Sequence, residues 1–336
     1  MSDNKILLDH GSGGLLTGEL ISEKFKPHFD NPLLSQMEDS TAFDINGTKL
    51  CFTTDSYVIN PIFFPGGNIG SLSVHGTVND IAMRGGKPLY LSAGFIIQEG
   101  FEISELEEIV SSMGQAAKNA GVHIITGDTK VVNKEAADKI FINTSAIGLI
   151  KYEANISVQE IRPGDAIIIN GTIGDHAAAI LNKREDLNLS SDIISDSAPL
   201  NKLVEQILKS CPEVHCMRDA TRGGLGGILS EIASQSGHTI NIDEVKIPIN
   251  DKVRGACEIL GLDPLFFANE GKMVLFCPSS YAQNILEIMK NNPFGKNAAI
   301  IGEVSEEKKG RLILQTVIGG TRQIDLPAGE LLPRIC

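Results

Sequence analysis

Four aspartates and one asparagine in the first half of the chain fall at turns or at the ends of apolar runs. Asp55 follows the apolar run 49–54, and Asp128 follows the run 122–125. Carboxylate and amide oxygens suit Mg²⁺, which usually combines a few carboxylates with phosphate oxygens, and strand ends can converge on one crevice of an α/β sheet. Each residue alone is more often a cap or a turn former, so both interpretations stay open. The five candidates are Asp39, Asp55, Asn79, Asp80 and Asp128.

Two glycine-rich turns, residues 10–14 and 218–224, precede helix-like patterns. Backbone N–H groups at the start of a helix can bind phosphate. The first turn has neither the Walker A nor the dinucleotide-binding spacing. A mobile terminal loop and an ion-paired turn are the respective alternatives. The residues of interest are Gly11, Gly13, Gly14, Arg218 and Arg222.

A carboxylate in apolar company is the next candidate. Asn269 and Glu270 follow the apolar run 265–268 and precede the strand-like run 273–277. If Glu270 is buried, its pKa would rise and it could act as a general base. A surface turn between two apolar segments is the alternative.

The C-terminal segment from Leu326 ends in a cysteine and contains two prolines and one glycine. It has no helix or strand pattern, and we expect it to be extended and mobile. Cys336, as a thiolate, would be an accessible nucleophile. Its own terminal carboxylate would raise the thiol pKa, so chemistry here needs an activating environment. An incidental terminal cysteine is the alternative.

The elements that must position these residues alternate between strands and helices. An apolar stripe from Ser104, with Glu107 three residues later, predicts a helix that starts in a capping box and ends at Gly121. Two more helices are expected at 222–236 and 252–260. Strands are predicted at 49–54, 91–98, 140–149, 166–170, 273–277 and 311–317.

Length and composition fit a two-domain α/β protein. The 336 residues are 42% hydrophobic, with 34 glycines and no tryptophan, which is enough for a sizeable core with many tight turns. The net charge of −13 argues against nucleic acid and anionic membranes as partners. With no membrane span, no secretory signal and no CxxC pair, we expect a cytoplasmic protein whose Cys51, Cys257 and Cys277 are reduced core thiols.

A turn at 162–165 predicts where a second half begins. The polar stretch 182–197 is expected to be a surface excursion. The predicted organisation is a glycine-rich segment and helix at 1–35, α/β domains at 36–155 and 156–308, and a final strand and tail at 309–336.

The order of these motifs resembles the HypE family, carbamoyl dehydratases of nickel–iron hydrogenase maturation, within the aminoimidazole ribonucleotide synthetase-like (PurM-like) superfamily. The terminal Pro-Arg-Ile-Cys separates that family from its relatives. The matching pieces, which span nearly the whole chain, are His10–Gly14, Phe52–Val58, Pro65–Gly70, Gly76–Ala82, Thr126–Val131, Arg218–Gly224, Phe267–Lys272 and Pro333–Cys336.

The resemblance implies two α/β domains with a flexible tail, and a homodimer formed through the sheets of the first, ATP-binding domains. It also implies a reaction. A HypF-type carbamoyltransferase would load carbamoyl onto Cys336, ATP would drive its dehydration to a thiocyanate, and the cyanide would pass to iron on a HypC–HypD scaffold.

The resemblance further implies roles for single residues. The five oxygen-bearing candidates and the N-terminal glycines would handle Mg²⁺ and ATP, with Asp39, Asp55, Asp80 and Asp128 at the metal. Lys130 would face the phosphates or the carbamoyl group, Glu270 would be the base, and Asn269 would orient the group. A kinase or selenophosphate synthetase of the same superfamily, or a non-enzymatic carrier, is the alternative function.

Overall fold

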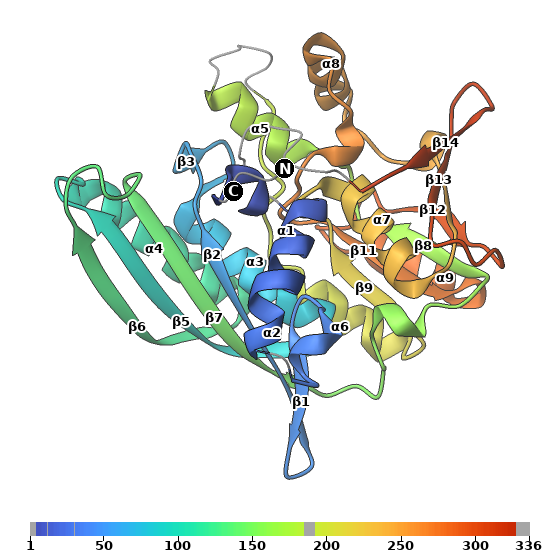
Figure 1. Ribbon diagram of the computed structural model, residues 1–336, viewed down its shortest axis with the longest axis horizontal. Coiled ribbons are helices and arrows are strands. Elements are labelled where there is room, and N and C mark those ends of the chain that lie inside the picture. Colours follow the sequence, from blue (N-terminus) through green and yellow to red (C-terminus); the bar gives the residue numbers. More distant parts are fainter. Residues whose placement is uncertain (1–4, 12, 30, 185–191, 327–336) are drawn as a thin grey trace.

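The computed structural model describes residues 5–11, 13–29, 31–184 and 192–326. Two sheets with their own helices lie side by side (Figure 1). The expected α/β architecture with two domains is therefore confirmed. The tail that ends in Cys336 lies outside the described residues.

The N-terminal domain is a five-stranded sheet with order β1-β2-β7-β5-β6. Only the β5–β6 pair is parallel. Helices α3 (Ile69–Met83) and α4 (Ile103–Ala120) cover one face of this sheet (Figure 1). Its strands are β1 (Thr41–Ile45), β2 (Thr48–Tyr57), β5 (Gly86–Gln98), β6 (His123–Val132) and β7 (Ile140–Ile150).

Alternation along these strands explains which face α3 covers. In β7, Ile140, Ile142 and Ala146 are buried against the helices, as expected for a period of two. The opposite face carries exposed apolar side chains, with Phe52 46% and Tyr90 45% exposed. Among the residues that the structure describes, this sheet is thus covered on one face only.

The C-terminal domain is a seven-stranded sheet, order β14-β13-β10-β12-β8-β11-β9. Its strands are β8 (Asp165–Ile169), β9 (Cys216–Asp219), β10 (Ile240–Asp243), β11 (Met273–Pro278), β12 (Ala299–Val304), β13 (Leu312–Gln315) and β14 (Thr321–Ile324). Its helices are α5 (Asp175–Arg184), α6 (Asn201–Ser210), α7 (Gly224–Ser236), α8 (Asp251–Leu260) and α9 (Ser279–Lys290).

This second sheet is buried on both faces at its centre. In β8, Ile167 and Ile169 pack in the core that contains α7, whereas Ile168 packs in the core of α6 and α9. Helices on both faces explain why β8 and β11 are near-continuous apolar runs rather than alternating ones.

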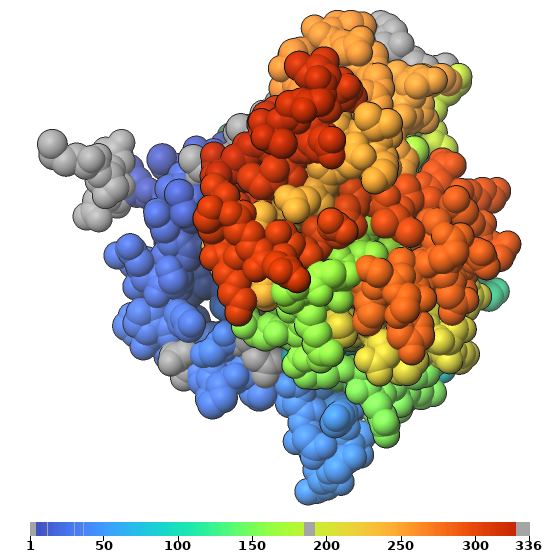
Figure 2. All heavy atoms as spheres, turned by 90° about the vertical axis from the view of Figure 1, so that its right-hand side faces the viewer, coloured from blue at the N-terminus to red at the C-terminus, as the bar shows by residue number. Residues whose placement is uncertain are grey.

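The N-terminal segment, with helices α1 (Gly14–Leu20) and α2 (Lys26–Phe29), lies across the front of the molecule between the two sheets (Figure 1). Figure 2 looks onto the C-terminal domain and shows the early residues, in blue, along one flank of it. A short hairpin, β3 (Phe63–Phe64) with β4 (Gly67–Asn68), precedes α3.

Most predicted elements are present, with one incorrect helix start. All six predicted strands overlap β2, β5, β7, β8, β11 and β13, and helices end at Gly121, Gly237 and Gly261 in the left-handed conformation. The predicted capping box at Ser104 is wrong. Helix α4 already begins at Ile103, and its N-cap Glu102 makes no side-chain cap hydrogen bond.

The stretch 182–197 differs from the expected surface excursion. Helix α5 continues to Arg184, and residues 193–200 form a partly buried strap between α5 and α6, in which Ile193, Ser195, Ala198 and Leu200 are buried and Ile194 is exposed. The strap is polar because its side chains have buried partners, described below. Residues 185–191 lie outside the described part.

Two further observations concern the expected location of the protein. In the described ranges, no helix is both long and apolar enough to span a membrane. Cys51, Cys257 and Cys277 are buried free thiols, as are Cys211 and Cys216.

Candidate functional site

A cluster of carboxylates lies between the two domains, where α3 meets β9. Asp80 on α3 accepts a hydrogen bond from Thr53 Oγ1 on β2 (2.8 Å), and the same hydroxyl donates to the Asp39 carbonyl (3.1 Å). Asp219 ends β9 and is buried. The charge of Asp55 on β2 raises the pKa of both Asp80 and Asp219. Thus Asp39, Asp55 and Asp80 come together as the sequence predicted.

The electrostatics of this cluster are unfavourable in the protein alone. Burial raises the pKa of Asp39 to about 6 and the pKa of Asp219 to about 8. Burial also raises the pKa of Asp80 well above its usual range, and the charges of Asp219, Asp55 and Asp39 add to that rise. Like charges held in one buried place destabilise each other's ionised form, so the cluster would gain from a bound cation.

Arg218 supplies part of the missing positive charge. Its Nε lies 2.5 Å from Asp39 Oδ1, and its terminal nitrogens lie 3.8 Å from Glu38 and from Glu231. Of the two interpretations of the 218–224 turn, ion pairing is therefore the one that Arg218 follows. Arg84 also lies 3.7 Å from Glu38, yet the acidic groups of this region still outnumber the guanidinium groups.

The donor set fits Mg²⁺. Asp39 Oδ2 is buried without a hydrogen-bond partner, and the neighbouring groups are carboxylates, the hard oxygen ligands that Mg²⁺ takes. Within the described ranges, no three His, Cys, Asp or Glu side chains are already arranged around one point as metal ligands. A cation that keeps water and phosphate oxygens in its coordination shell needs no such arrangement.

The N-terminal glycine loop lies against the second glycine-rich turn. A Cβ on Gly13 would lie 3.2 Å from Arg222 Cβ, and Gly13 has a φ of +83°, so a side chain there would be strained. Gly13 N–H donates to Thr17 Oγ1 at 2.9 Å. Gly11 and Gly14 flank this point, and Gly14 is the first residue of α1.

Glu270 is buried at the same domain junction. Its charge, together with those of Asp55 and Asp80, adds to the burial that raises the pKa of Tyr57. Of the two interpretations of this segment, a buried acid rather than a surface turn is therefore the one observed. The carboxylate cluster and Glu270 face one region.

The side-chain amides of Asn79 and Asn269 form hydrogen bonds within the protein through both the nitrogen and the oxygen. Asn79 Nδ2 donates to the carbonyls of Ala198 (3.0 Å) and Glu270 (3.4 Å), and its Oδ1 accepts from Leu200 N (2.8 Å). Asn79, expected at Mg-ATP, here joins α3 to the strap and to Glu270.

Asn269 does the same one residue before Glu270. Its Nδ2 donates to the carbonyls of Ala220 (2.8 Å) and Phe267 (3.0 Å), and its Oδ1 accepts from Gly174 N (2.7 Å). Its partners fix the backbone that carries Glu270.

Asp128 and Lys130 lie elsewhere in a single chain. They pair with each other at 3.0 Å on the exposed edge strand β6. In the strand register, Asp55 lies opposite Thr144, Thr144 lies opposite Ala93, and Ala93 lies opposite Gly127. Gly127 is therefore on the same face of the sheet as Asp55. Because side chains alternate along a strand, Asp128 points to the opposite, uncovered face. With two strands between, the separation is roughly 14 Å.

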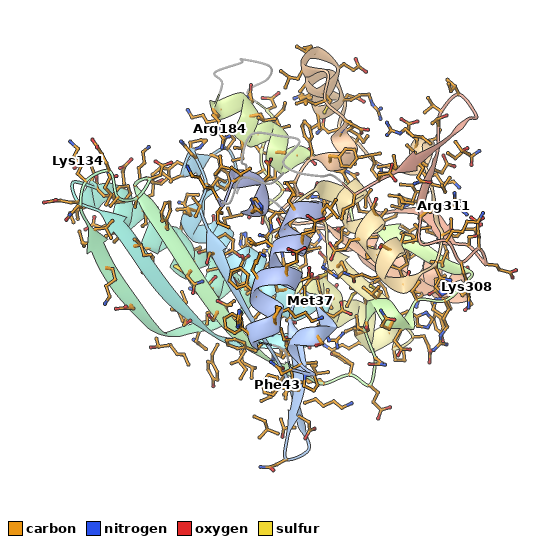
Figure 3. All side chains as sticks on the ribbon, in the orientation of Figure 1. Met37, Phe43, Lys134, Arg184, Lys308 and Arg311 are labelled. Carbon is orange, nitrogen blue, oxygen red and sulfur yellow. The ribbon has the colours of Figure 1, made fainter. Side chains whose placement is uncertain are left out.

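Figure 3 labels one residue near each of these two places. Met37, two residues before Asp39, lies by the N-terminal helices, whereas Lys134, four residues after Lys130, lies at the far end of the sheet.

Three residues of this region were absent from the predicted site. The sequence indicates Asp219 only as part of a phosphate-binding or ion-paired turn, whereas in the structure it is the last residue of the buried strand β9. Asp196 and Lys272 form a buried ion pair at 2.8 Å. Their pairing over 76 positions leaves no local signal in the sequence.

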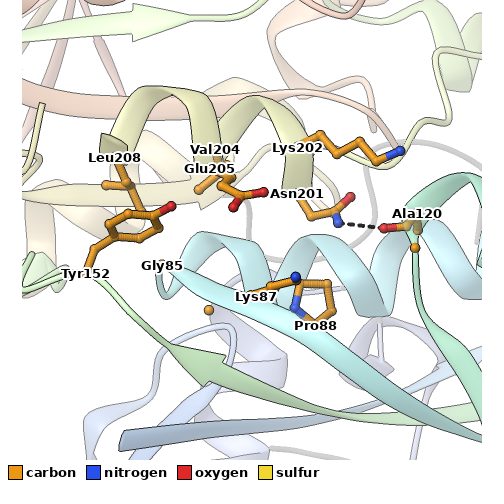
Figure 4. Close-up of a pocket in the computed structure, with 12 residues that line it drawn as sticks. Gly85, Lys87, Pro88, Ala120, Tyr152, Asn201, Lys202, Val204, Glu205 and Leu208 are labelled. Carbon is orange, nitrogen blue, oxygen red and sulfur yellow. Dashed lines mark hydrogen bonds between the residues drawn. The ribbon is translucent and has the colours of Figure 1, made fainter. Parts of the chain in front are cut away.

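Several pockets lie outside the cluster in the described part of the chain, and two of them border elements of the domain junction. One, about 170 Å³, lies between α6, the end of α4 and the start of β5, near Tyr152, Glu205 and Asn201 (Figure 4). It shares no residue with the cluster. The other, about 330 Å³, is lined by the strap, Gly171 and Lys272.

Known families match both domains. The AIR synthase related protein N-terminal domain matches residues 37–150, and the corresponding C-terminal domain matches residues 162–315. Carbamoyl dehydratase HypE of Azotobacter vinelandii is 47% identical over 100% of this chain and 98% of the relative. The HypE of Escherichia coli K12 is 46% identical over 99% of this chain and 100% of the relative.

Solved structures agree. A structure of HypE in complex with ATP has a TM-score of 0.83 at 47% identity, covering 99% of this chain and 100% of that one. A HypE–HypF complex has a TM-score of 0.87 at 48% identity, covering 92% and 99%. The chain belongs to the HypE carbamoyl dehydratase family, within the AIR synthase related proteins.

Proposed function

We propose that this protein dehydrates a carbamoyl group carried on the Cys336 thiol, at the expense of ATP, to a thiocyanate that supplies cyanide for hydrogenase iron. Family membership supports the reaction class. The observation that carries the proposal is the mutually repelling set of half-buried Asp39 and Asp80 with buried Asp219, which shares the domain junction with buried Glu270. That arrangement suits a triphosphate bound next to a base.

The chemistry needs a better leaving group than the amide oxygen. ATP would transfer its γ-phosphoryl group to the carbamoyl oxygen while one N–H proton leaves and a C=N bond forms. Departure of phosphate with that oxygen, and loss of the second N–H proton, leaves S–C≡N. Such a transfer depends on positioning and charge neutralisation more than on covalent catalysis.

The acidic cluster would hold Mg²⁺ through Asp39, Asp55, Asp80 and Asp219. Bound Mg²⁺ supplies charge neutralisation for the triphosphate. The glycine loop at residues 11–14, beside Arg222, would border the phosphates.

Glu270 would be the base that removes an N–H proton. Its buried position beside the carboxylate cluster suits a group that accepts a proton from a bound substrate. Asn79 and Asn269 would act by holding its backbone. Glu270→Gln should abolish dehydration while leaving carbamoyl loading intact; dehydration at the wild-type rate would remove Glu270 from the mechanism.

The uncovered face of the N-terminal sheet would form a homodimer. Phe52, Tyr90 and Ile96 are exposed there, and Asp128 and Lys130 point to the same side. A second copy could bring this pair to a neighbouring ATP site, where Lys130 would face the phosphates or the carbamoyl group. Ile96→Lys should yield monomers in sedimentation; a dimer of unchanged stability would contradict this interface.

The reaction also requires partners. A HypF-type carbamoyltransferase would load Cys336, and a HypC–HypD scaffold would receive the cyanide. Because these steps use a reduced thiol, they suit the cytoplasm.

Mass spectrometry of the C-terminal peptide tests the proposal. The protein would be incubated with its carbamoyltransferase, carbamoyl phosphate and Mg-ATP. We expect a carbamoyl adduct on Cys336, followed by an ATP-dependent loss of one water mass. An adduct that never dehydrates would indicate a carrier. ATP use without an adduct, unchanged by deletion of Cys336, would indicate a small-molecule kinase.

A further inference from the structure

The strap, residues 193–200, is hydrogen-bonded to both domains. Ser197 Oγ lies 2.9 Å from His75 Nδ1 on α3, and Ser195 Oγ lies 2.8 Å from His176 Nδ1 on α5. Ser195 N also donates to Pro65 O at 2.8 Å. The middle of the strap is therefore held from both sides.

Asp196 lies between Ser195 and Ser197 and contacts the segment that contains Glu270, the proposed base. Its Oδ1 accepts from Glu270 N at 3.1 Å, and its Oδ2 accepts from Lys272 Nζ at 2.8 Å. The Asp196 side chain is 5% exposed and that of Lys272 is 10% exposed. Lys272 thus compensates a buried charge that would otherwise be costly.

The contact is close on the backbone as well. A Cβ on Gly271 would lie 2.0 Å from the Asp196 carbonyl oxygen, so only glycine lets the strap reach this segment. Ala198 N donates to Glu270 O at 3.4 Å. Both the N–H and the carbonyl of Glu270 are consequently fixed by the strap.

We propose that Asp196, with Lys272 as its counter-ion, is a positioning residue that sets the Glu270 carboxylate for proton removal. This inference rests on the proposed dehydratase function. A base must lie within hydrogen-bond reach of its proton, and a misplacement of about 1 Å can cost roughly 100-fold in rate. Asp196 touches no reacting atom, so its loss should act through Glu270.

Asp165 provides a matched control in the same domain. It is equally buried, and its Oδ2 accepts one backbone N–H, from Arg162 (2.8 Å), and pairs with one basic side chain, His215 (2.8 Å). Asp165→Ala should therefore destabilise the fold about as much as Asp196→Ala, without any link to Glu270.

The experiment follows water loss from carbamoylated Cys336 in single turnover, with Mg-ATP affinity and the melting temperature measured beside it. We expect Asp196→Ala to slow dehydration by about 100-fold, with Mg-ATP affinity unchanged within about twofold. Asp196→Asn keeps an acceptor for Glu270 N and should recover most of the rate. Asp165→Ala should keep the wild-type rate per folded molecule.

Either of two results would overturn the positioning role: a wild-type rate in Asp196→Ala, or an equal slowing in Asp165→Ala. Wild-type protein and Glu270→Gln are assayed in parallel. If wild-type protein never loses water, the proposed function itself fails. If Glu270→Gln is as fast as wild type, the base assignment fails, and the positioning role fails with it.

Discussion

Two sets of buried polar groups lie at the domain junction, and they differ in how well they are satisfied. Asn79, Asn269 and Asp196 find protein partners for their polar atoms. In the carboxylate cluster, Asp39 Oδ2 has no hydrogen-bond partner, and Asp80 and Asp219 repel each other. Buried polar groups are normally satisfied. The satisfied set therefore builds the junction, and the unsatisfied set is where a ligand completes the structure.

The largest effect on stability should come from the satisfied set. Asn269→Ala removes three buried side-chain hydrogen bonds and leaves Gly174 N without its acceptor, while the Ala220 carbonyl keeps only the backbone N–H of residue 269. We expect the free energy of unfolding to fall by about 3 kcal/mol, measured by urea denaturation. A loss below about 1 kcal/mol would mean that the amide is not structural.

His176, whose Nδ1 bonds Ser195 Oγ while its buried Nε2 has no hydrogen-bond partner, should give the stability a pH dependence. Burial lowers its pKa from 6.5 to about 4, so the unfolded chain binds a proton that the folded chain does not between these values. Stability is full above pH 6.5 and falls as the pH is lowered, by about 2 kcal/mol from pH 6.5 to pH 5.

Denaturation of wild type and of His176→Gln at several pH values separates this contribution from the carboxylates, whose raised pKa values act in the opposite direction. The variant should show a shallower loss of stability on acidification. An identical slope would mean that His176 titrates normally.

The carboxylate cluster should make stability change with pH in the opposite direction. The pKa of Asp219 is raised from 3.8 to about 8, so wild-type stability falls as the pH rises between these values. Asp219→Asn removes this loss. The variant should equal wild type near pH 4 and be the more stable protein at pH 8. Lower stability at pH 8 would refute the repulsion.

Much of the fold could be predicted from the sequence because its signals are local. The strand runs, the helix ends at Gly121 and Gly237, and the acidic type of site all follow from neighbouring residues. The strap could not be predicted, since its polar residues are buried only through partners such as Lys272. The face of the sheet on which the Asp128 side chain lies depends on strand register and strand order, and neither can be read from the sequence.

The smallest effect should come from the exposed pair on β6. Asp128 and Lys130 are about 70% exposed on their side chains, and surface ion pairs contribute little. Replacing both with alanine should change the free energy of unfolding by less than about 0.5 kcal/mol while slowing dehydration by the dimer. Calorimetric melting and the single-turnover assay would show both; an unchanged rate would leave this pair without a role in the reaction.

The unsatisfied carboxylates are proposed to hold the Mg²⁺ of Mg-ATP. Titration calorimetry of ATP into wild type and into Asp80→Asn, each with and without Mg²⁺, tests it most directly. We predict Mg²⁺-dependent binding in wild type, and at least about tenfold weaker Mg-ATP binding in the variant, which corresponds to 1.4 kcal/mol. Equal affinity in both proteins, or wild-type binding that ignores Mg²⁺, would contradict the account.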